Sequence, residues 1–447
     1  MKFHTTAQST TPASSASQWP VSKGYAWTVF ALGFGLLLSD YMSRQVLNAV
    51  FPMLKAEWLL SDAALGSLSG IVALAVGVLT FPMSLLADRW GRVRSLLLAA
   101  TLWSLATLGC AVSASYGEMF VGRLFVGIGE AAYGSVGIAV VLSIFPVTLR
   151  ATLSGAFIAG GAFGSVLGVA LGGAVAQAAG WRWAFAAMGI FGLVLAAVYG
   201  VVVKESRLAP HGRPSGSDDA EARGRLRTHL PRLFSSVSVI SAYVGSGLQL
   251  FIAGALLSWL PSFFNRYYHM APAKAGGAAG AFAMIIGLGM IFGGVASDRI
   301  SSTAPIRKWA VAAGCSLGAL LLLTLAFQLP SGTGQLLALA VGCLLSAGSA
   351  GPAAAMVANL TPASIAATAF ATLTLANSLL GLAPGPAVTG ALADRFGLLG
   401  ALRLVPLVAV LATLAFLVGR HWYERDLHRL ADLSTKAETM HPSQVPS

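Results

Sequence analysis

The sequence predicts an all-α membrane protein with twelve transmembrane helices in two pseudo-symmetric six-helix bundles. The first observation is composition: the 447 residues are 56% hydrophobic and only 10% charged, with a mean hydropathy of +0.76. Soluble domains carry about 25% charged residues, so this chain lacks the polar surface that folding in water requires. The second observation is a set of twelve long apolar runs, and the third is a motif that recurs in both halves of the chain.

Each apolar run is close to the length of about 20 residues that a helix needs to cross the hydrocarbon core. In the first half the runs cover residues 25–49, 65–86, 95–112, 119–144, 155–179 and 183–203. In the second half they cover residues 237–263, 276–295, 309–329, 335–360, 366–390 and 402–419. We therefore expect a polar tail (1–24), a first bundle (25–203), a central loop (204–235), a second bundle (236–419) and a C-terminal tail (420–447).

The distribution of lysine and arginine predicts the orientation. If residue 1 lies in the cytoplasm, 20 of the 28 basic residues fall on the cytoplasmic side, 6 fall on the outer side and 2 lie within spans. Cytoplasmic loops of membrane proteins are enriched in these residues, so both termini are expected inside, in a bacterial inner membrane. The net charge of +12 is then a topology signal that requires no nucleic acid partner.

The repeated motif is an Asp-Arg pair that follows the second span of each half. Asp88 and Arg89 stand in the first copy, Asp298 and Arg299 stand 210 residues later, and Arg92 follows the first pair. Asp88 can pair with either arginine or cap a neighbouring helix, which predicts a cytoplasmic gate of these five residues that breaks when the inner side opens. The alternative is that these charges only set the topology.

Glycines repeat at nearly the same interval. Gly164, Gly168 and Gly173 in the fifth span correspond to Gly381, Gly385 and Gly390 in the eleventh, at an offset of 217 residues. Small residues spaced in this way let helices approach closely in lipid, so close packing is the favoured interpretation. Repeated halves joined by a long loop are typical of secondary transporters, whose substrate site lies between the halves.

These motifs resemble those of the major facilitator superfamily, and within it the spinster-like branch. The residues that carry the resemblance are Leu86-Ala87-Asp88-Arg89-Trp90-Gly91-Arg92, Asp40-Tyr41-Met42-Ser43-Arg44 and Arg123-Leu124-Phe125-Val126-Gly127-Ile128-Gly129-Glu130. The resemblance implies a transporter that works by rocker-switch alternating access, with the first and fourth spans lining its central cavity. It also implies a substrate of the lysolipid or sphingoid type.

Four ionisable residues lie well inside the predicted spans: Asp40, Arg44, Arg123 and Glu130. A charge in the bilayer costs at least about 2.5–3.5 kcal/mol, so such residues face partners or a water-filled cavity. We expect them to form a proton-coupling site, with Arg123 also a candidate for binding an anion. The alternative is two permanent ion pairs that only hold helices together.

This sequence differs at two positions from the motifs of related transporters, and both differences affect the predicted function. In the spinster-like branch the acid of the first span usually stands directly before the arginine, where this chain has Ser43, whereas its own acid is Asp40. Drug antiporters of the superfamily carry a Gly-Pro step in the fifth span, where Gly168 is followed here by Val169. A drug/proton efflux pump is therefore the third choice of function.

The second half offers mainly neutral polar groups. Tyr243, Gln249 and Asn377, together with Tyr41, Tyr133 and Arg123 of the first half, are the expected substrate contacts. A charged half that faces a neutral half suits an amphiphilic organic anion, and the alternative is proton-driven uptake of a small carboxylate or aromatic acid.

Other functional classes lack support in the sequence. All seven histidines lie outside the predicted spans, and the three cysteines lie inside them without metal-ligand spacing. We expect no metal, no cofactor and no enzymatic activity. The expected partners are substrate, protons and lipid, with the protein acting as a monomer.

Overall fold

The computed structural model describes residues 19, 21–131, 133–208, 236–361 and 366–440. Most of the predicted N-terminal tail and central loop, and the last seven residues, lie outside this description. The first bundle contains α1 (Lys23–Trp58), α2 (Asp62–Trp90), α3 (Arg92–Val112), α4 (Tyr116–Glu130), α5 (Tyr133–Ile144), α6 (Val147–Ala179) and α7 (Trp181–Val202), with the short α8 (Glu205–Leu208) after it. The second contains α10 (Val237–Tyr267), α11 (Pro272–Ile300), α12 (Arg307–Gln328), α13 (Thr333–Ala347), α14 (Ala350–Asn359), α15 (Ala366–Asn377), η2 (Ser378–Leu382), α16 (Pro384–Leu404), η3 (Val405–Leu407) and α17 (Val408–Met440).

Helix is the expected conformation because the hydrocarbon core offers no water to backbone polar groups, and a helix satisfies them within one segment. Capping residues fix where several helices begin. Ser61 Oγ accepts a hydrogen bond from the amide of Ala64 at the start of α2. Ser115 Oγ accepts one from Glu118 at the start of α4, and the Glu118 carboxylate in turn accepts one from the amide of Ala114. Such reciprocal bonds satisfy amides that have no partner within the helix.

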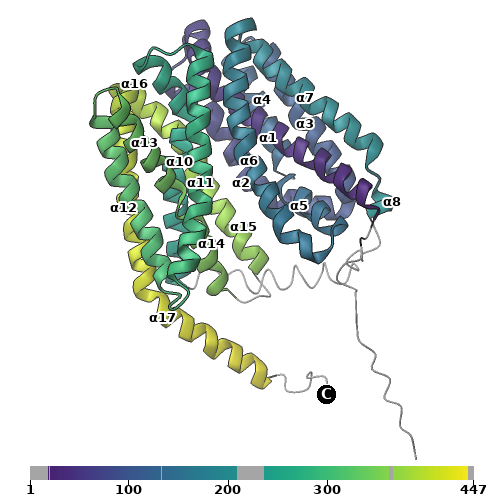
Figure 1. Ribbon diagram of the computed structural model, residues 1–447, viewed down its shortest axis with the longest axis vertical. Helices are drawn as coiled ribbons and strands as arrows, with labels where there is room; N and C mark the ends of the chain where they lie inside the picture. Colours follow the sequence, from purple (N-terminus) through teal and green to yellow (C-terminus); the bar gives the residue numbers. More distant parts are fainter. Residues whose placement is uncertain (1–18, 20, 132, 209–235, 362–365, 441–447) are drawn as a thin grey trace, which may run out of the picture.

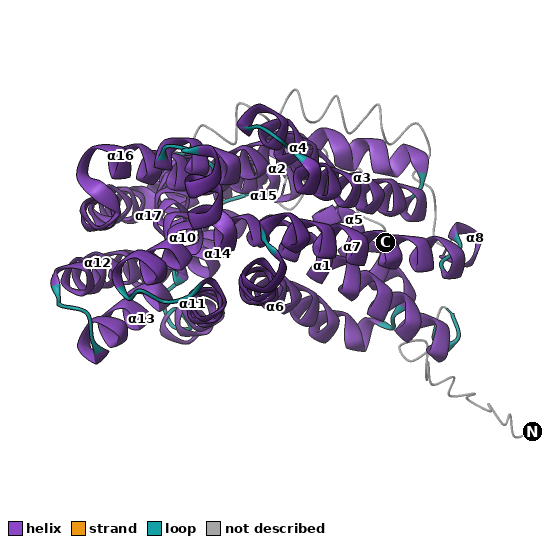
Figure 2. Cartoon of the chain, turned by 90° about the horizontal axis from the view of Figure 1, so that it is seen from above, coloured by secondary structure: helices purple, strands orange, loops and turns teal. Residues whose placement is uncertain are grey.

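The helices form two groups that lie side by side (Figure 1, Figure 2). We call the end where α1 begins and α8 lies the tail end, and the end with the α1–α2 and α10–α11 connections the far end. The bundles meet toward the far end, through α2 with α16 and α6 with α11, and their ribbons diverge toward the tail end (Figure 1). The largest buried apolar cluster includes Phe51 of α1 and Trp259 of α10, whose ring centroids lie 5.2 Å apart, and so joins the two bundles.

Ten candidate spans meet a length and hydropathy criterion in the described residues, compared with the twelve expected. The difference arises from how helices are divided. The predicted fourth span is split into α4 and α5, neither of which reaches 18 residues. The last candidate runs over 62 residues because α15 to α17 follow one another without a loop, and it covers both the predicted eleventh and twelfth spans.

The breaks within helices repeat between the bundles. α4 ends at Glu130 and α5 begins at Tyr133, while α13 ends at Ala347 and α14 begins at Ala350. Each position in the second pair lies 217 residues after its counterpart, which is the offset of the glycine repeat. The repeat that the sequence indicates is therefore also present in the course of the backbone.

The repeated glycines pack closely, as the favoured interpretation predicts. A Cβ on Gly168 of α6 would lie 2.7 Å from the Cα of Met42 in α1. A Cβ on Gly385 of α16 would lie 2.5 Å from the carbonyl oxygen of Phe251 in α10. These distances leave no room for a side chain, because real Cβ atoms do not approach backbone atoms so closely. Glycine is therefore required at these crossings for the helices to approach as they do.

We predict that Gly168→Val destabilises the purified protein by about 1–3 kcal/mol, because the new side chain pushes α6 away from α1. Thermal unfolding in detergent measures this effect. The matched control is Gly155→Val on the same helix, where an added Cβ meets no atom within 4 Å. Equal melting temperatures for the two variants would show that the crossing does not need glycine.

Candidate functional site

The four charged residues predicted inside the membrane lie on two adjacent helices and converge. Arg44 of α1 donates two hydrogen bonds to Oε2 of Glu130 at the end of α4, from Nε at 2.9 Å and from a terminal nitrogen at 2.5 Å. The Glu130 side chain is buried, while that of Arg44 keeps 23% of its surface exposed. The ion pair therefore joins two helices, and Arg44 remains accessible at its edge.

Arg123 has different partners. It donates hydrogen bonds to the carbonyl oxygens of Ser43 at 2.8 Å, Arg44 at 3.0 Å and Leu68 at 3.4 Å, and it has no exposed surface. Carbonyl oxygens at close range can satisfy a buried guanidinium that has no carboxylate partner. In this conformation Arg123 thus ties α4 to α1 and α2 and presents no surface to a substrate.

Asp40 lies beside the ion pair. It is 6% exposed and interacts electrostatically with both Glu130 and Arg44. Its Oδ1 atom and the Oε1 atom of Glu130 have no hydrogen-bond partner among the described residues. Two acids therefore share one arginine, since the second arginine is bound to carbonyl groups.

Of the two first-bundle tyrosines expected at the substrate site, Tyr41 lies against the ion pair and Tyr133 does not. The guanidinium of Arg44 lies 5.6 Å from the ring centroid of Tyr41, within the range of a cation–π contact. Tyr133 is buried, donates its hydroxyl to the carbonyl oxygen of Gly33 and packs edge-on against Trp103. Tyr41 adjoins the exposed edge of the ion pair, whereas Tyr133 uses its hydroxyl within its own bundle.

Of the three residues of the second bundle that we expect to contact the substrate, one has a hydrogen-bond partner within the protein and two have unpartnered polar atoms. Tyr243 donates its hydroxyl to the carbonyl oxygen of Ala369 at 3.2 Å. Gln249 is 1% exposed, and neither its amide oxygen nor its amide nitrogen has a partner in the described part of the chain. Asn377, which directly precedes the π-helical turn η2, has an unpartnered Oδ1. Gln249 and Asn377 therefore keep hydrogen-bonding capacity, and π-helical turns occur frequently at functional sites.

The predicted gate residues lie at the tail end. The side chain of Asp88 lies outside the description, and Arg89 is exposed. The backbone amide of Arg92 donates to Glu205 of α8, whose carboxylate caps α3. Asp298 is 77% exposed and lies 4.0 Å from Lys308 of its own bundle. For these described side chains the structure gives no contact between the bundles, and the gate stays a prediction.

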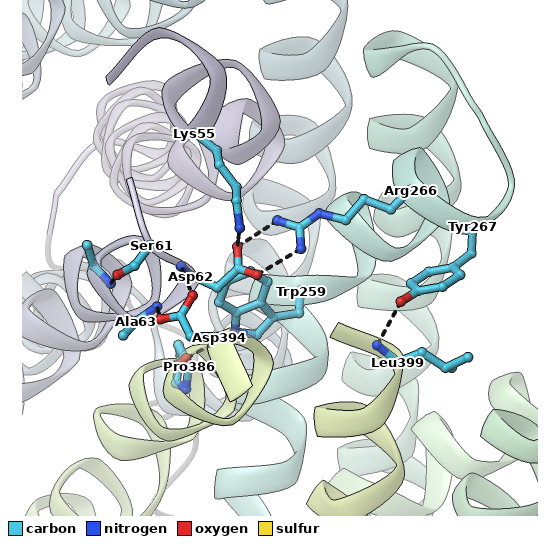
Figure 3. Close-up of polar contacts among 11 residues, drawn as sticks. Lys55, Ser61, Asp62, Ala63, Trp259, Arg266, Tyr267, Pro386, Asp394 and Leu399 are labelled. Carbon is cyan, nitrogen blue, oxygen red and sulfur yellow. Dashed lines mark hydrogen bonds and ion pairs between the residues drawn. The ribbon is translucent and has the colours of Figure 1, made fainter. Parts of the chain in front are cut away.

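The far end carries a polar cluster that the sequence analysis did not single out (Figure 3). Asp62, the first residue of α2, receives two hydrogen bonds from Arg266 of α10 at 2.7 and 2.9 Å and one from Lys55 of α1 at 2.7 Å. Asp394 of α16 accepts the backbone amides of Asp62 at 2.7 Å and Ala63 at 2.9 Å. We call Lys55, Asp62, Arg266 and Asp394 the far-end latch, because two of its contacts cross between the bundles.

The latch has a simple physical basis. The first amides of a helix lack partners within the helix and carry positive partial charge, so a carboxylate such as that of Asp394 binds there favourably. Bidentate pairs such as Arg266 with Asp62 are among the stronger charge-assisted contacts. A sequence signal for Asp394 was present, since Leu392-Ala393-Asp394-Arg395-Phe396-Gly397 closely repeats the sequence around Asp88. Gly91 and Gly397, the last residues of the two copies, both have positive φ.

With fold and site described, the class of protein follows. A family model of the major facilitator superfamily matches residues 33–386, and the chain belongs to this superfamily of multi-pass membrane transporters. Within it the chain resembles the spinster proteins. Protein spinster of Drosophila melanogaster is 28% identical over 257 residues, which are 57% of this chain and 40% of that protein. The aligned region thus spans less than half of that relative.

Solved structures show the same fold. A bacterial homologue of the human lysosomal transporter spinster, in an inward-facing and occupied conformation, superposes with a TM-score of 0.80 at 20% identity, covering 91% of this chain and 99% of that chain. A D-xylose–proton symporter superposes with a TM-score of 0.68 at 19% identity, covering 88% and 97%. The predicted fold and family are confirmed.

We predict that Asp394→Ala shifts the protein toward a state with an open far end by about 0.5–2 kcal/mol, the range for loss of a helix-capping carboxylate. Spin labels at Leu59 and Ser331, both exposed at the far end of opposite bundles, report the change as longer distances in pulsed electron paramagnetic resonance. Glu57→Ala is the control, because Glu57 bonds Trp181 and Arg182 of its own bundle at the same end. An unchanged distance distribution for Asp394→Ala would contradict a latching role.

Proposed function

We propose that this transporter is proton-coupled and moves an amphiphilic organic anion, of the lysolipid or sphingoid type, by rocker-switch alternating access. The observation that carries the proposal is the Arg44–Glu130 pair with Asp40 beside it. Arg44 is hydrogen-bonded to Glu130, and the hydrogen bonds of Arg123 go to carbonyl oxygens. The buried Asp40 therefore has no ion-pair contact of its own among the described residues, and a carboxylate in that position is costly. A proton removes that cost, so occupancy by a proton and the arrangement of the pair are linked.

The bias of lysine and arginine supports a cytoplasmic tail end with both termini inside, in a bacterial inner membrane. In that orientation the far end lies on the outer side of the membrane. A conformation in which the far-end latch is formed is therefore inward-facing. Alternation would then break the latch and form the contacts of Asp88, Arg89, Arg92, Asp298 and Arg299. We propose that one copy of the chain is sufficient for this cycle.

The two bundles offer different chemistry to a substrate. Arg44 is the charged member of the coupling site that keeps exposed surface, and it lies over the ring of Tyr41. We therefore propose that Arg44 binds the anionic group of the substrate, whereas Arg123 holds α1 in place in this conformation. In the second bundle Gln249 and Asn377 have unpartnered amide atoms that suit the neutral polar part of an amphiphile.

A second candidate is proton-driven uptake of a small carboxylate or aromatic acid. The free amide of Gln249 favours it, because a fully buried amide with both atoms unpartnered suits a compact polar ligand. The two candidates share the coupling site and differ in the apolar bulk of the substrate.

We predict that Glu130→Gln and Asp40→Asn preserve folding and insertion but abolish the dependence of flux on a pH gradient, because neither amide side chain binds and releases a proton in the working range. Proteoliposomes with an imposed gradient and a pH-sensitive dye inside measure proton movement when lysophosphatidylglycerol is added. Glu118→Gln is the control on the same helix, since Glu118 only caps the start of α4. Full proton-coupled flux in both site variants would refute the coupling assignment.

We predict that lysophosphatidylglycerol raises the melting temperature of the purified protein whereas benzoate does not. A ligand at 100 times its Kd adds about 2.7 kcal/mol of stability, which a thermal shift assay detects. Stabilisation by benzoate alone would contradict the lipid assignment and support the second candidate. Arg44→Gln removes the proposed anion contact and should abolish the shift, whereas the exposed variant Arg182→Gln at the far end should leave it unchanged.

A further inference from the structure

The second bundle has a hollow at its far end. The hollow lies between the end of α10, the α12–α13 connection, α13 and α16, and its volume is about 300 Å³. That volume is at the lower end of the range of about 300–1,000 Å³ for small-molecule sites. All the residues that line it belong to the second bundle, whereas the coupling residues belong to the first. The hollow is therefore separate from the coupling site.

Arg403 is the charged residue of the lining. Its Nε atom donates a hydrogen bond to the carbonyl oxygen of Phe327 at 3.0 Å, which ties α16 to the end of α12. Its two terminal nitrogens have no hydrogen bond or ion pair with any residue that the structure describes. A guanidinium anchored in this way keeps two parallel donors free, and these match the two oxygens of a carboxylate.

No carboxylate of the second bundle competes for Arg403. Residues 237–423 contain two acids, of which Asp298 lies at the tail end and Asp394 at the far end. The Asp394 carboxylate is occupied by two backbone amides of α2. The basic residues at the far end of the second bundle are Arg266, Lys274, Arg395 and Arg403. This excess of positive charge raises the local concentration of anions, so the hollow favours an anionic ligand.

The neutral groups of the lining indicate the rest of the ligand. The hydroxyl of Tyr267 accepts a hydrogen bond from the amide of Leu399 at 3.0 Å, and its own proton has no acceptor among the described residues (Figure 3). Gln328 and Ser331 are exposed and supply an amide and a second hydroxyl. Phe263 is buried and supplies an apolar floor. Several polar groups over an apolar floor suit a compact ligand that carries hydroxyl groups.

We propose that this hollow binds a small polyhydroxylated carboxylate, an acid of the sugar-acid type. Its carboxylate pairs with Arg403, and its hydroxyl groups bind the neutral polar side chains of the lining. Tyr267 directly follows Arg266 of the far-end latch, and Leu399 lies on α16 five residues after Asp394 (Figure 3). A bound acid would thus bridge α10 and α16 beside the latch. The proposal goes beyond the proposed function, whose coupling and substrate contacts use none of the lining residues.

Isothermal titration calorimetry on the purified full-length protein tests the ligand class with three probes. D-gluconate carries both the carboxylate and the hydroxyl groups, sorbitol has the hydroxyl groups without the carboxylate, and hexanoate has the carboxylate without the hydroxyl groups. We expect gluconate to bind at least about tenfold more tightly than either of the others, because each of these leaves part of the lining unpaired. Equal binding of sorbitol would refute an anion site, and equal binding of hexanoate would refute the hydroxyl contacts. No detectable binding of gluconate at millimolar concentration would overturn the proposal.

Variants then locate the bound acid. Arg403→Gln should weaken gluconate binding by about tenfold or more, the loss expected for a charge-assisted hydrogen bond. The matched control is Arg395→Gln, an exposed arginine of the same helix outside the lining, which should bind like the wild type. Because Arg403 also contacts Phe327, a second variant is needed that spares this contact. Gln328→Ala changes an exposed side chain of the lining and should weaken binding about two- to tenfold.

Arg44→Gln distinguishes this hollow from the proposed transport site. It should leave gluconate binding unchanged, since Arg44 lies on α1 and outside the lining. If Arg44→Gln abolishes gluconate binding and Arg403→Gln does not, the acid occupies the transport site. That result would overturn the present proposal and support the second candidate function. Wild-type affinity in both Arg403→Gln and Gln328→Ala would also overturn it.

Discussion

The cost of burying charge away from water is the constraint on which the first bundle depends. Arg44 and Glu130 meet that cost by pairing across α1 and α4, and the guanidinium of Arg123 meets it with carbonyl oxygens. These contacts fix the two helices against each other at the level of Asp40. Because breaking a buried pair is far more costly than loosening a surface one, the protonation that we propose at this site would have to be accommodated by both helices.

The far-end latch joins the bundles in a different way. Asp394 binds the first amides of α2, and Asp62 binds Arg266 across the same boundary. The contact of Asp394 with the first amides of α2 is of the size of a helix-capping interaction, on the order of 0.5–2 kcal/mol. The Asp62 side chain is buried and Arg266 is 25% exposed, so their bidentate pair is the stronger of the two contacts. Contacts that a modest free energy can break suit the alternation between two states that we propose, since both states must be populated.

The internal repeat allows equivalent positions of the two bundles to be compared, and the bundles differ in charge at one of them. Glu130 ends α4 at the break before α5, and at the equivalent break in the second bundle, 217 residues later, stands Ala347. The backbone is thus repeated while the charge is not. A charged site in one bundle and neutral amides such as Gln249 in the other divide the tasks of coupling and substrate contact that we propose.

The sequence determined the class, the helical content, the grouping into two halves and the identity of the buried charges, because hydropathy and charge scarcity act residue by residue. It also indicated the glycine crossings, whose close packing the structure confirms. Only the tertiary structure decided partners: that Glu130 pairs with Arg44, that Arg123 binds carbonyls, and that Asp394 caps α2. Partners lie tens to hundreds of residues apart, and spacing along one helix cannot show which neighbouring helix supplies the nearest opposite charge.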